Sequence, residues 1–536
     1  MVSRDKKPWN THSVMKTALW LAVAGLAQAL SLAWPWGGQS LPVLQVLGMA
    51  VMCRQLVQAG TKRELIKRAW WSATVWLSAT FWWLFISLHT YGGMPAILAG
   101  LAVFLLAGAL AMYYALAALV SFSISSGIAD ASPKWLQAAI FASAWTLAEI
   151  ARALVFTGFP WGAVGYAHVD GALSAFSPWL GVYGVGWVAA VVAMVCAQAA
   201  QLSMRSGAMR YRGLALGLAC LIAVQVPAPM GHAPTTSNLP DLQVHLLQGN
   251  IPQSEKFQAS TGIAQALTWY REELMQVKSG LAIAPETALP LLPNHLPPGY
   301  WEGLRAHFTQ GESAALIGVP LKDLGPNGQM VYSNSAIGWR SAQAQDYRYD
   351  KDHLVPFGEF VPPLFRWFTD LMSMPLSDFK AGGHHPDTFD WQGQRIAPHI
   401  CYEDLFGEEL ARGFIDPKRA PTVLVNITNI AWFGDSIAID QHLNIARMRT
   451  LELQRPMVRA TNTGMTAVID HQGRVTAHLP RHQTGVLSAL VQGRDDPPTF
   501  FAMWAARWGL WPLVGVCVLV VGLSWRGRRQ SHVAGA

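Results

Sequence analysis

Cys401 is the one cysteine between Leu221 and Val516, and it stands at the end of the apolar run RIAPHIC. The acidic YEDLF that follows opens a segment with apolar residues at helical spacing, so we expect a strand-to-helix turn at the thiol. A cysteine at the start of a helix lies near the positive end of the helix dipole, which favours the thiolate nucleophile. An inert core cysteine would leave the same pattern, because free cysteine is among the most buried residue types.

Two further strand-like runs end in a charged residue. LAIAPE ends at Glu286, and the alternating QDYRYDK ends at Lys351, which is followed by Glu359. Taken singly, each charge is expected to be a solvated surface group. A carboxylate, an ammonium and a thiol that each terminate a strand fit one rim of one sheet, where catalytic groups collect. There Glu286 could take the proton of Cys401, while Lys351, oriented by Glu359, stabilises an oxyanion.

The first part of the chain has the composition of a membrane domain. Residues 1–230 hold five of the 32 acidic side chains, and the whole chain is only 13% charged, against about 25% in soluble domains. A helix needs about 20 apolar residues to cross a bilayer. Eight stretches approach that length, at roughly 17–36, 40–58, 69–90, 94–120, 136–157, 176–200, 211–227 and 505–525.

The basic residues orient these eight spans. With a cytoplasmic N-terminus, the predicted inner segments hold sixteen Lys and Arg residues and the short outer loops hold none, as the positive-inside rule requires. The net charge of +7 is therefore interpreted as orienting charge, and no nucleic-acid partner is expected. The same model places about 228–504 outside the cytoplasm, in the periplasm if this is a bacterial inner-membrane protein.

The expected organisation has five parts. Residues 1–227 form a membrane domain with about seven spans, and 228–241, rich in Pro, Thr and Ser, is a linker. Residues 242–500 alternate short β-type runs with helical segments, which indicates an α/β sandwich. A last span at 501–525 and a cytoplasmic tail at 526–536 complete the chain.

Glu286, Lys351 and Cys401 occur in a characteristic order within six recognisable segments. These are QGNIPQSEKF (248–257), PETALP (285–290), YDKDHLVPFGEFVP (349–362), CYEDLF (401–406), NITNIAWFG (426–434) and QHLNIARMRTLELQRPMVRATNTG (441–464). With eight spans, the chain resembles the apolipoprotein N-acyltransferases, a membrane-bound family of the carbon–nitrogen hydrolase (nitrilase) superfamily. That resemblance implies a four-layer αββα sandwich.

The resemblance also implies roles for individual residues. Glu286 corresponds to the general base, Lys351 to the lysine that stabilises the intermediate, and Cys401 to the nucleophile. Around this triad the matching supporting positions are Glu359, Tyr402 and Glu403. The implied reaction moves an acyl chain from a phospholipid, expected to be phosphatidylethanolamine, to the cysteine as a thioester. The α-amino group of the N-terminal diacylglyceryl-cysteine of a lipoprotein then receives the chain.

Three aromatic residues of these segments, Phe257, Phe357 and Trp432, are expected to contact the lipid substrate. The family usually has tryptophan where this chain has Phe257, and we expect altered lipid packing there rather than lost activity. The family also has an acidic residue where this chain has Ile430, so a polar group is missing near the active-site loop.

No cofactor is expected, because the acyl donor is already an ester and the sequence contains no P-loop. The adjacent His384 and His385 show no ligand spacing with other acidic or cysteine residues, so no metal is expected. We expect the protein to be a monomer.

Two features leave alternatives open. Residues 355–376 are unusually apolar and form either a buried helix or a lid that dips into the outer leaflet to admit acyl chains. Glu149 and Arg152 stand one turn apart in the fifth span and are expected to form a charge pair inside the bundle. That pair could contact a lipid headgroup or be structural.

Two other functions compete with acyl transfer. A membrane-tethered nitrilase-type amidase would use water in place of the amine, but one span would suffice as its tether. A transporter or receptor with an outer sensing domain would need functional charges within the bundle, and only one pair qualifies. It would also leave the three strand-end residues unexplained.

Overall fold

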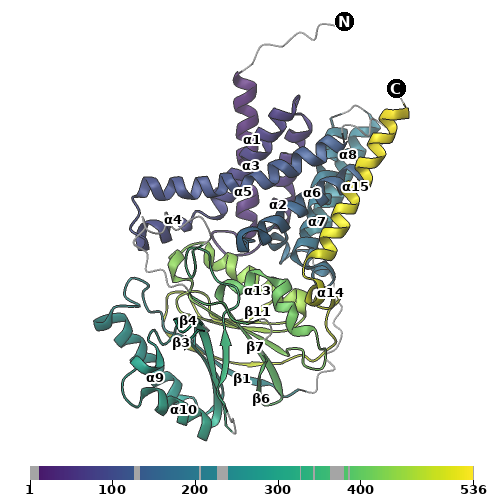
Figure 1. Ribbon diagram of the computed structural model, residues 1–536. Coiled ribbons are helices and arrows are strands. Elements are labelled where there is room, and N and C mark those ends of the chain that lie inside the picture. Colours follow the sequence, from purple (N-terminus) through teal and green to yellow (C-terminus); the bar gives the residue numbers. More distant parts are fainter. Residues whose placement is uncertain are drawn as a thin grey trace.

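The protein has two stacked parts, a helical bundle and an α/β sandwich (Figure 1). The computed structural model describes residues 11–125, 133–204, 207–225, 239–325, 327–341, 345–361, 379–383 and 387–534. Most of the expected linker at 228–241 and most of the apolar segment 355–376 lie outside the described residues. Their predicted roles therefore remain predictions.

The bundle is built from long apolar helices. They are α1 (Thr11–Leu32), α2 (Pro42–Val57), α3 (Lys62–Thr80), α5 (Ala96–Ser125), α6 (Lys134–Leu154), α7 (Ser177–Leu202), α8 (Ala208–Gln225) and α15 (Trp511–Ala534). Short elements α4 (Leu84–Ile86) and η1 (Ser87–Tyr91) follow α3, and α14 (Phe500–Trp508) precedes α15. Alanine and leucine, which have high helix propensity, dominate α5.

Each of the eight predicted spans contains a helix, but the count of eight is not confirmed. Four helices in the described residues are long and apolar enough to cross a membrane, and six qualify if each of two bent pairs counts as one span. These pairs are α3 with α4–η1, bent by 63°, and α14 with α15, bent by 91°. Helix α2 has only 16 residues, and α8 is not among the qualifying helices.

The sandwich consists of two mixed six-stranded sheets, which confirms the predicted α/β class. The first has the order β12-β1-β2-β3-β4-β5 and the second β11-β10-β9-β8-β7-β6. The strands of the first sheet are β1 (Leu242–Gln248), β2 (Ser279–Ile283), β3 (Glu312–Leu324), β4 (Met330–Trp339), β5 (Tyr347–Asp350) and β12 (Gly485–Val491). Those of the second are β6 (Phe389–Trp391), β7 (Gln394–Ile400), β8 (Val423–Thr428), β9 (Met457–Thr461), β10 (Ala467–Ile469) and β11 (Val475–His478).

Apolar side chains from both sheets meet in one core, with Leu246 and Ile283 on one side and Ile400 and Val425 on the other. Helices α9 (Ala264–Gln276) and α10 (Tyr300–Gln310) cover the outer face of the first sheet. Helix α13 (Ala438–Leu453) lies between the second sheet and the bundle (Figure 1). The arrangement from α9 to α13 is the four-layer αββα order.

Strand direction brings the three predicted site residues to one edge. Strands β2 and β3 run parallel, and β5 regains the direction of β3 through two antiparallel steps. Glu286 follows β2 and Lys351 follows β5, so both leave the first sheet at the same edge. Cys401 follows β7, which runs parallel to β8 in the second sheet.

The sandwich and the bundle share a continuous interface through α13. Asn444 donates from its amide to the carbonyls of Leu32 and Gly38, at 3.0 and 2.9 Å. Glu452 accepts from the amide of Val182 at 2.6 Å, just after the point where Gly181 breaks α7 with φ +67°. A buried carboxylate at a broken helix pairs with the exposed amides of its second half. The edge that carries the three predicted site residues is thereby held against the helical bundle.

Candidate active site

The structure brings the strand-end charges into direct contact. Lys351 is buried, and its Nζ lies 3.3 Å from Oε1 of Glu286 and 2.9 Å from Oε2 of Glu359. The amide of Asn334 donates to both carboxylates at 2.7 Å. Two carboxylates therefore share one ammonium and one amide in the interior of the domain.

Cys401 begins a single 3-10 turn, η7 (Cys401–Leu405), with φ +54°. This left-handed conformation costs a non-glycine residue about 1–3 kcal/mol and must be held by its surroundings. The carbonyl of Cys401 accepts from Nε2 of His442 at 3.3 Å and from the amide of Asn426 at 3.4 Å. Arg459 donates to Nδ1 of His442 at 2.8 Å, which leaves the ring proton on Nε2.

The expected helix after Cys401 is not a continuous α-helix. The turn η7 is followed only by the four-residue α12 (Gly407–Leu410) and a second short turn. The carboxylate of Glu403 accepts from the backbone amide of Ile400, as at the start of a helix, and from the backbone amide of Asp352 at 2.7 Å. The dipole of so short an element gives the thiol little support, so the expectation of a dipole-stabilised thiolate is wrong.

The electrostatics instead favour a neutral thiol and an ionised base. Burial raises the pKa of Cys401 to about 12, and the nearby negative charge of Glu286 adds to this more than Lys351 offsets it. Burial also acts to raise the pKa of Glu286, but Lys351, Asn334 and other donors hold it below its ordinary value. Glu286 is thus an anion close to the thiol, as the predicted role of a general base requires.

Lys351 remains a cation despite its burial. Desolvation acts to lower its pKa, but the carboxylates of Glu286 and Glu359 raise it above its ordinary value. An ammonium fixed beside the thiol can stabilise negative charge that develops on a carbonyl oxygen during attack. The carboxylate of Glu359 also accepts from the backbone amide of Val355 at 2.8 Å, which fixes its position beside Lys351.

The supporting residues Tyr402 and Glu403 fasten the thiol turn on two sides. Glu403 accepts from the hydroxyl of Tyr349 at 2.7 Å, so it ties the turn to the strand that carries Lys351. Tyr402 points the other way and donates to the carbonyl of Gly158, in the bundle, at 3.0 Å. Both predicted supporting positions therefore lie against the site, with different partners.

Sequence reasoning missed two residues of the site. Lys256 is 2% exposed, and its Nζ donates to the backbone carbonyl of Glu286 at 3.2 Å. Burial lowers the pKa of Lys256 to about 8, although Glu286 and Cys401 favour its charged form. Asn334 was also missed, because it stands between Ser333 and Ser335 in β4, where a polar residue gives no sign that it is buried. Lys256 gave no signal beyond its place in a recognised segment.

The three predicted lipid contacts lie around this centre rather than in it. Phe257 is 56% exposed and Trp432 is 40% exposed, which suits contact with acyl chains. Trp432 packs edge-on against Tyr91 of η1 at 5.7 Å, so it sits where sandwich and bundle meet. Phe357 is partly buried with φ +62°.

Ile430, which stands where the family has an acidic residue, is buried in the apolar core shared with the bundle. Apolar packing therefore takes the place of a polar group at this position.

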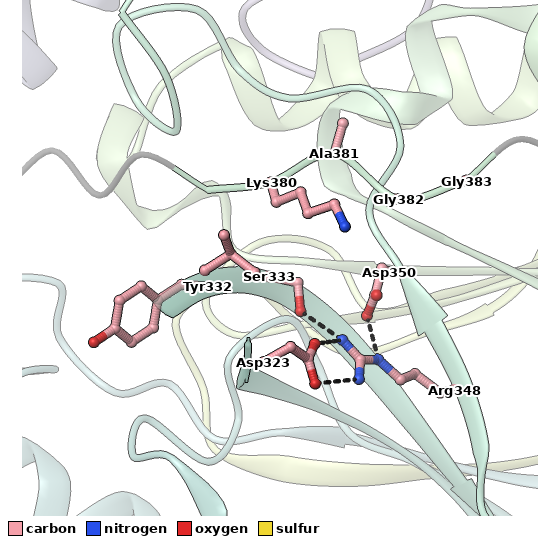
Figure 2. Close-up of a pocket in the computed structure, with 10 residues that line it drawn as sticks. Asp323, Tyr332, Ser333, Arg348, Asp350, Lys380, Ala381, Gly382 and Gly383 are labelled. Atoms are coloured by element: carbon pink, nitrogen blue, oxygen red, sulfur yellow. Dashed lines mark hydrogen bonds and ion pairs between the residues drawn. The ribbon is translucent and has the colours of Figure 1, made fainter. Parts of the chain in front are cut away.

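A separate cavity of about 210 Å³ lies beside β5. Figure 2 shows Arg348 at its centre, bound to Asp323, Asp350 and Ser333, with Lys380 nearby. None of the triad residues lines it, and its central arginine is already paired. Across the described ranges, no group of three or more His, Cys, Asp or Glu residues is placed to hold a metal ion.

Comparison with known proteins matches both parts of the chain. Residues 24–195 match the apolipoprotein N-acyltransferase N-terminal domain, and residues 243–495 match the carbon-nitrogen hydrolase domain. The apolipoprotein N-acyltransferase of Verminephrobacter eiseniae is 50% identical, over 96% of this chain and 98% of its own. Those of Ralstonia nicotianae and Bordetella bronchiseptica are 40% and 39% identical, each over 96% of this chain and over 94% and 97% of their own.

Lys256 predicts a pH dependence. Above about pH 8 its ammonium loses its proton, so charge that supports the attacking sulfur disappears and acylation of Cys401 by a nitrophenyl ester should slow. Lys256→Arg should remove this decline, because a guanidinium stays charged. Lys256→Met should be about tenfold slower at neutral pH, equivalent to about 1.4 kcal/mol.

The readout is the initial rate of nitrophenolate release, corrected with Cys401→Ala. Exposed Lys278 provides the matched control, and Lys278→Arg should keep the native profile. A Lys256→Arg protein that still slows above about pH 8 would show that another group causes the decline.

Proposed function

This chain belongs to the apolipoprotein N-acyltransferases, and we propose that Cys401 carries the acyl group as a thioester between donor and acceptor. As an acyltransferase of this family, the enzyme acts on phospholipid and lipoprotein substrates. The observation that supports the role of Cys401 is the adjacent buried pair, an ionised Glu286 and a charged Lys351 that lie 3.3 Å apart. The amidase alternative is not favoured, because the curated relatives are acyltransferases over nearly the whole chain.

In the first half-reaction, Sγ of Cys401 attacks the ester carbonyl of the phospholipid and its proton passes to Glu286. The carbonyl oxygen becomes an oxyanion that Lys351 stabilises. When the tetrahedral intermediate collapses, the carbon–oxygen bond breaks and Glu286 returns the proton to the leaving glycerol oxygen. The products are an acyl thioester and a lysophospholipid.

In the second half-reaction, the neutral α-amino group of the diacylglyceryl-cysteine attacks the thioester carbonyl. Glu286 takes a proton from the attacking nitrogen, and Lys351 again stabilises the oxyanion. The carbon–sulfur bond breaks, and the proton held by Glu286 returns to the sulfur. The lipoprotein leaves with an amide-linked third chain and Cys401 is a thiol again, so the sequence is ping-pong.

We infer that the enzyme resides in the inner membrane, with residues 242–500 in the periplasm and phosphatidylethanolamine as the donor. The N-terminal end of α1 and the C-terminal end of α15 both lie at the end of the bundle away from the sandwich (Figure 1), which fits two cytoplasmic termini. The exposed Phe257 and Trp432 would then face the outer leaflet. We infer that one chain suffices, because the buried cluster of Lys351, Glu286 and Glu359 is complete within it.

The orientation predicts the outcome of a reporter fusion. Alkaline phosphatase, which requires an oxidising compartment for its disulfides, should be active when inserted at the turn before Tyr300 that opens α10. The same insertion between α2 and α3, after Gly60, should give no activity. The reverse pattern would place the sandwich in the cytoplasm.

The thioester predicts a covalent adduct. Purified enzyme incubated with phospholipid labelled in its acyl chain should retain label that hydroxylamine removes, and Cys401→Ala should retain none. Cys220→Ala, which removes a partly exposed thiol of α8, is the matched control and should be labelled normally.

A diacylated lipopeptide with a free α-amino group should discharge the adduct, whereas the same peptide with an acetylated amine should not. Discharge by water at the same rate would establish a hydrolase instead. Label retained by Cys401→Ala would exclude Cys401 as the acyl carrier.

A further inference from the structure

Arg152 is a buried cation of a membrane helix that binds a loop instead of an acidic partner. It is 1% exposed. Its guanidinium donates to the carbonyls of Phe159 and Trp161 at 2.6 and 2.7 Å and to the hydroxyl of Tyr114 at 3.1 Å. The expected direct pair with Glu149 is not formed, because Glu149 accepts from the amide of Val164 at 2.9 Å. Arg152 and Glu149 both lie in α6, and both bind backbone groups of the same loop.

The loop that Arg152 contacts, residues 157–164, begins with two residues of positive φ, of which only the glycine adopts that conformation readily. Thr157 has φ +66° and Gly158 has φ +85°, and both values lie in the left-handed region. A Cβ on Gly158 would come within 1.9 Å of the carbonyl oxygen of Ala153. The conformation of Thr157 persists only where the surroundings determine it. The contacts of Arg152 to the carbonyls of Phe159 and Trp161 contribute to that constraint, beside backbone hydrogen bonds of the loop.

The same loop contacts residues next to each half of the site. Gly158 accepts from the hydroxyl of Tyr402, the neighbour of Cys401. The carbonyl of Thr157 lies 2.9 Å from Nε2 of His353, two residues after Lys351. The ring of Trp161 stacks on His442 at 5.5 Å, and His442 binds the carbonyl of Cys401. The loop 157–164 of the bundle thus contacts residues close in sequence to both Cys401 and Lys351.

We propose that Arg152 is a positioning residue, which holds the loop 157–164 so that Cys401 and Lys351 keep their mutual geometry. This inference rests on the proposed role of Cys401. A headgroup contact for Arg152 is not compatible with its burial and its loop contacts. The loop therefore makes the bundle part of the catalytic framework as well as an anchor.

The test is the burst of acyl-thioester formation by the full-length enzyme in phospholipid nanodiscs. Arg152→Gln removes the charge and at least one carbonyl contact, and the burst rate should fall about tenfold, since small misplacements of reacting groups carry large rate costs. The apparent KM for phospholipid should not change. Arg152→Lys should recover part of the rate, because its ammonium can still reach one carbonyl.

Arg68 of α3 provides the matched control, since it also donates to a backbone carbonyl, that of Gln55, but does not contact the loop. Arg68→Gln should keep the native burst rate. Tyr402→Phe removes the hydrogen bond from the other side with little risk to folding. If Arg152 acts through this contact, the double variant should be about as slow as the slower single variant.

Three results would overturn the inference while leaving thioester formation intact. One is a native burst rate in Arg152→Gln. Another is a reduced burst amplitude with an unchanged rate, which would show a purely structural role. The third is a change confined to KM, which would indicate a headgroup contact. Absence of any thioester in the native enzyme would refute the proposed function itself.

Discussion

The structure depends on a buried cluster in which two carboxylates share one ammonium. Burying an isolated ion costs several kcal/mol, so Glu286, Glu359 and Lys351 are tolerated only because each is satisfied by the others. The side-chain amide of Asn334 bridges the carboxylates, and the backbone amide of Asn429 donates to Glu286 at 2.9 Å. The negative charge of Glu286 in this cluster raises the pKa of the Cys401 thiol more than the positive charge of Lys351 lowers it. The high pKa of the thiol and its dependence on a base both follow.

The topology of the fold explains why such a cluster can exist. Parallel strands deliver Glu286 and Lys351 to one edge of one sheet, and the second sheet delivers Cys401 opposite them. That edge is closed by the bundle, through α13 and the loop after α6, so water is displaced by protein. The same closure places exposed aromatic residues at the junction of sandwich and bundle.

Much of this arrangement could be predicted from the sequence. Apolar runs that end in Glu286, Lys351 and Cys401 indicated strand ends, and the matching segments indicated the superfamily. The number of spans was less predictable, because α2 is short and α3 bends into α4–η1. Helical spacing paired Glu149 with Arg152, but tertiary contacts to one loop separated them. The helix expected after Cys401 was also wrong, because apolar residues at helical spacing do not show that the segment divides into the short elements η7 and α12. Lys256 was not predicted, because only the folded chain brings its ammonium to the carbonyl of Glu286.

We expect Cys401 to rest as a neutral thiol and to lose its proton to Glu286 only during attack. The most direct test is the ultraviolet absorbance of thiolate, taken as the difference between the native enzyme and Cys401→Ala across a pH titration. A neutral thiol should give no thiolate band at neutral pH, and the band should appear only in strongly alkaline solution, towards a pKa of about 12. A thiolate band already present at neutral pH would contradict this expectation.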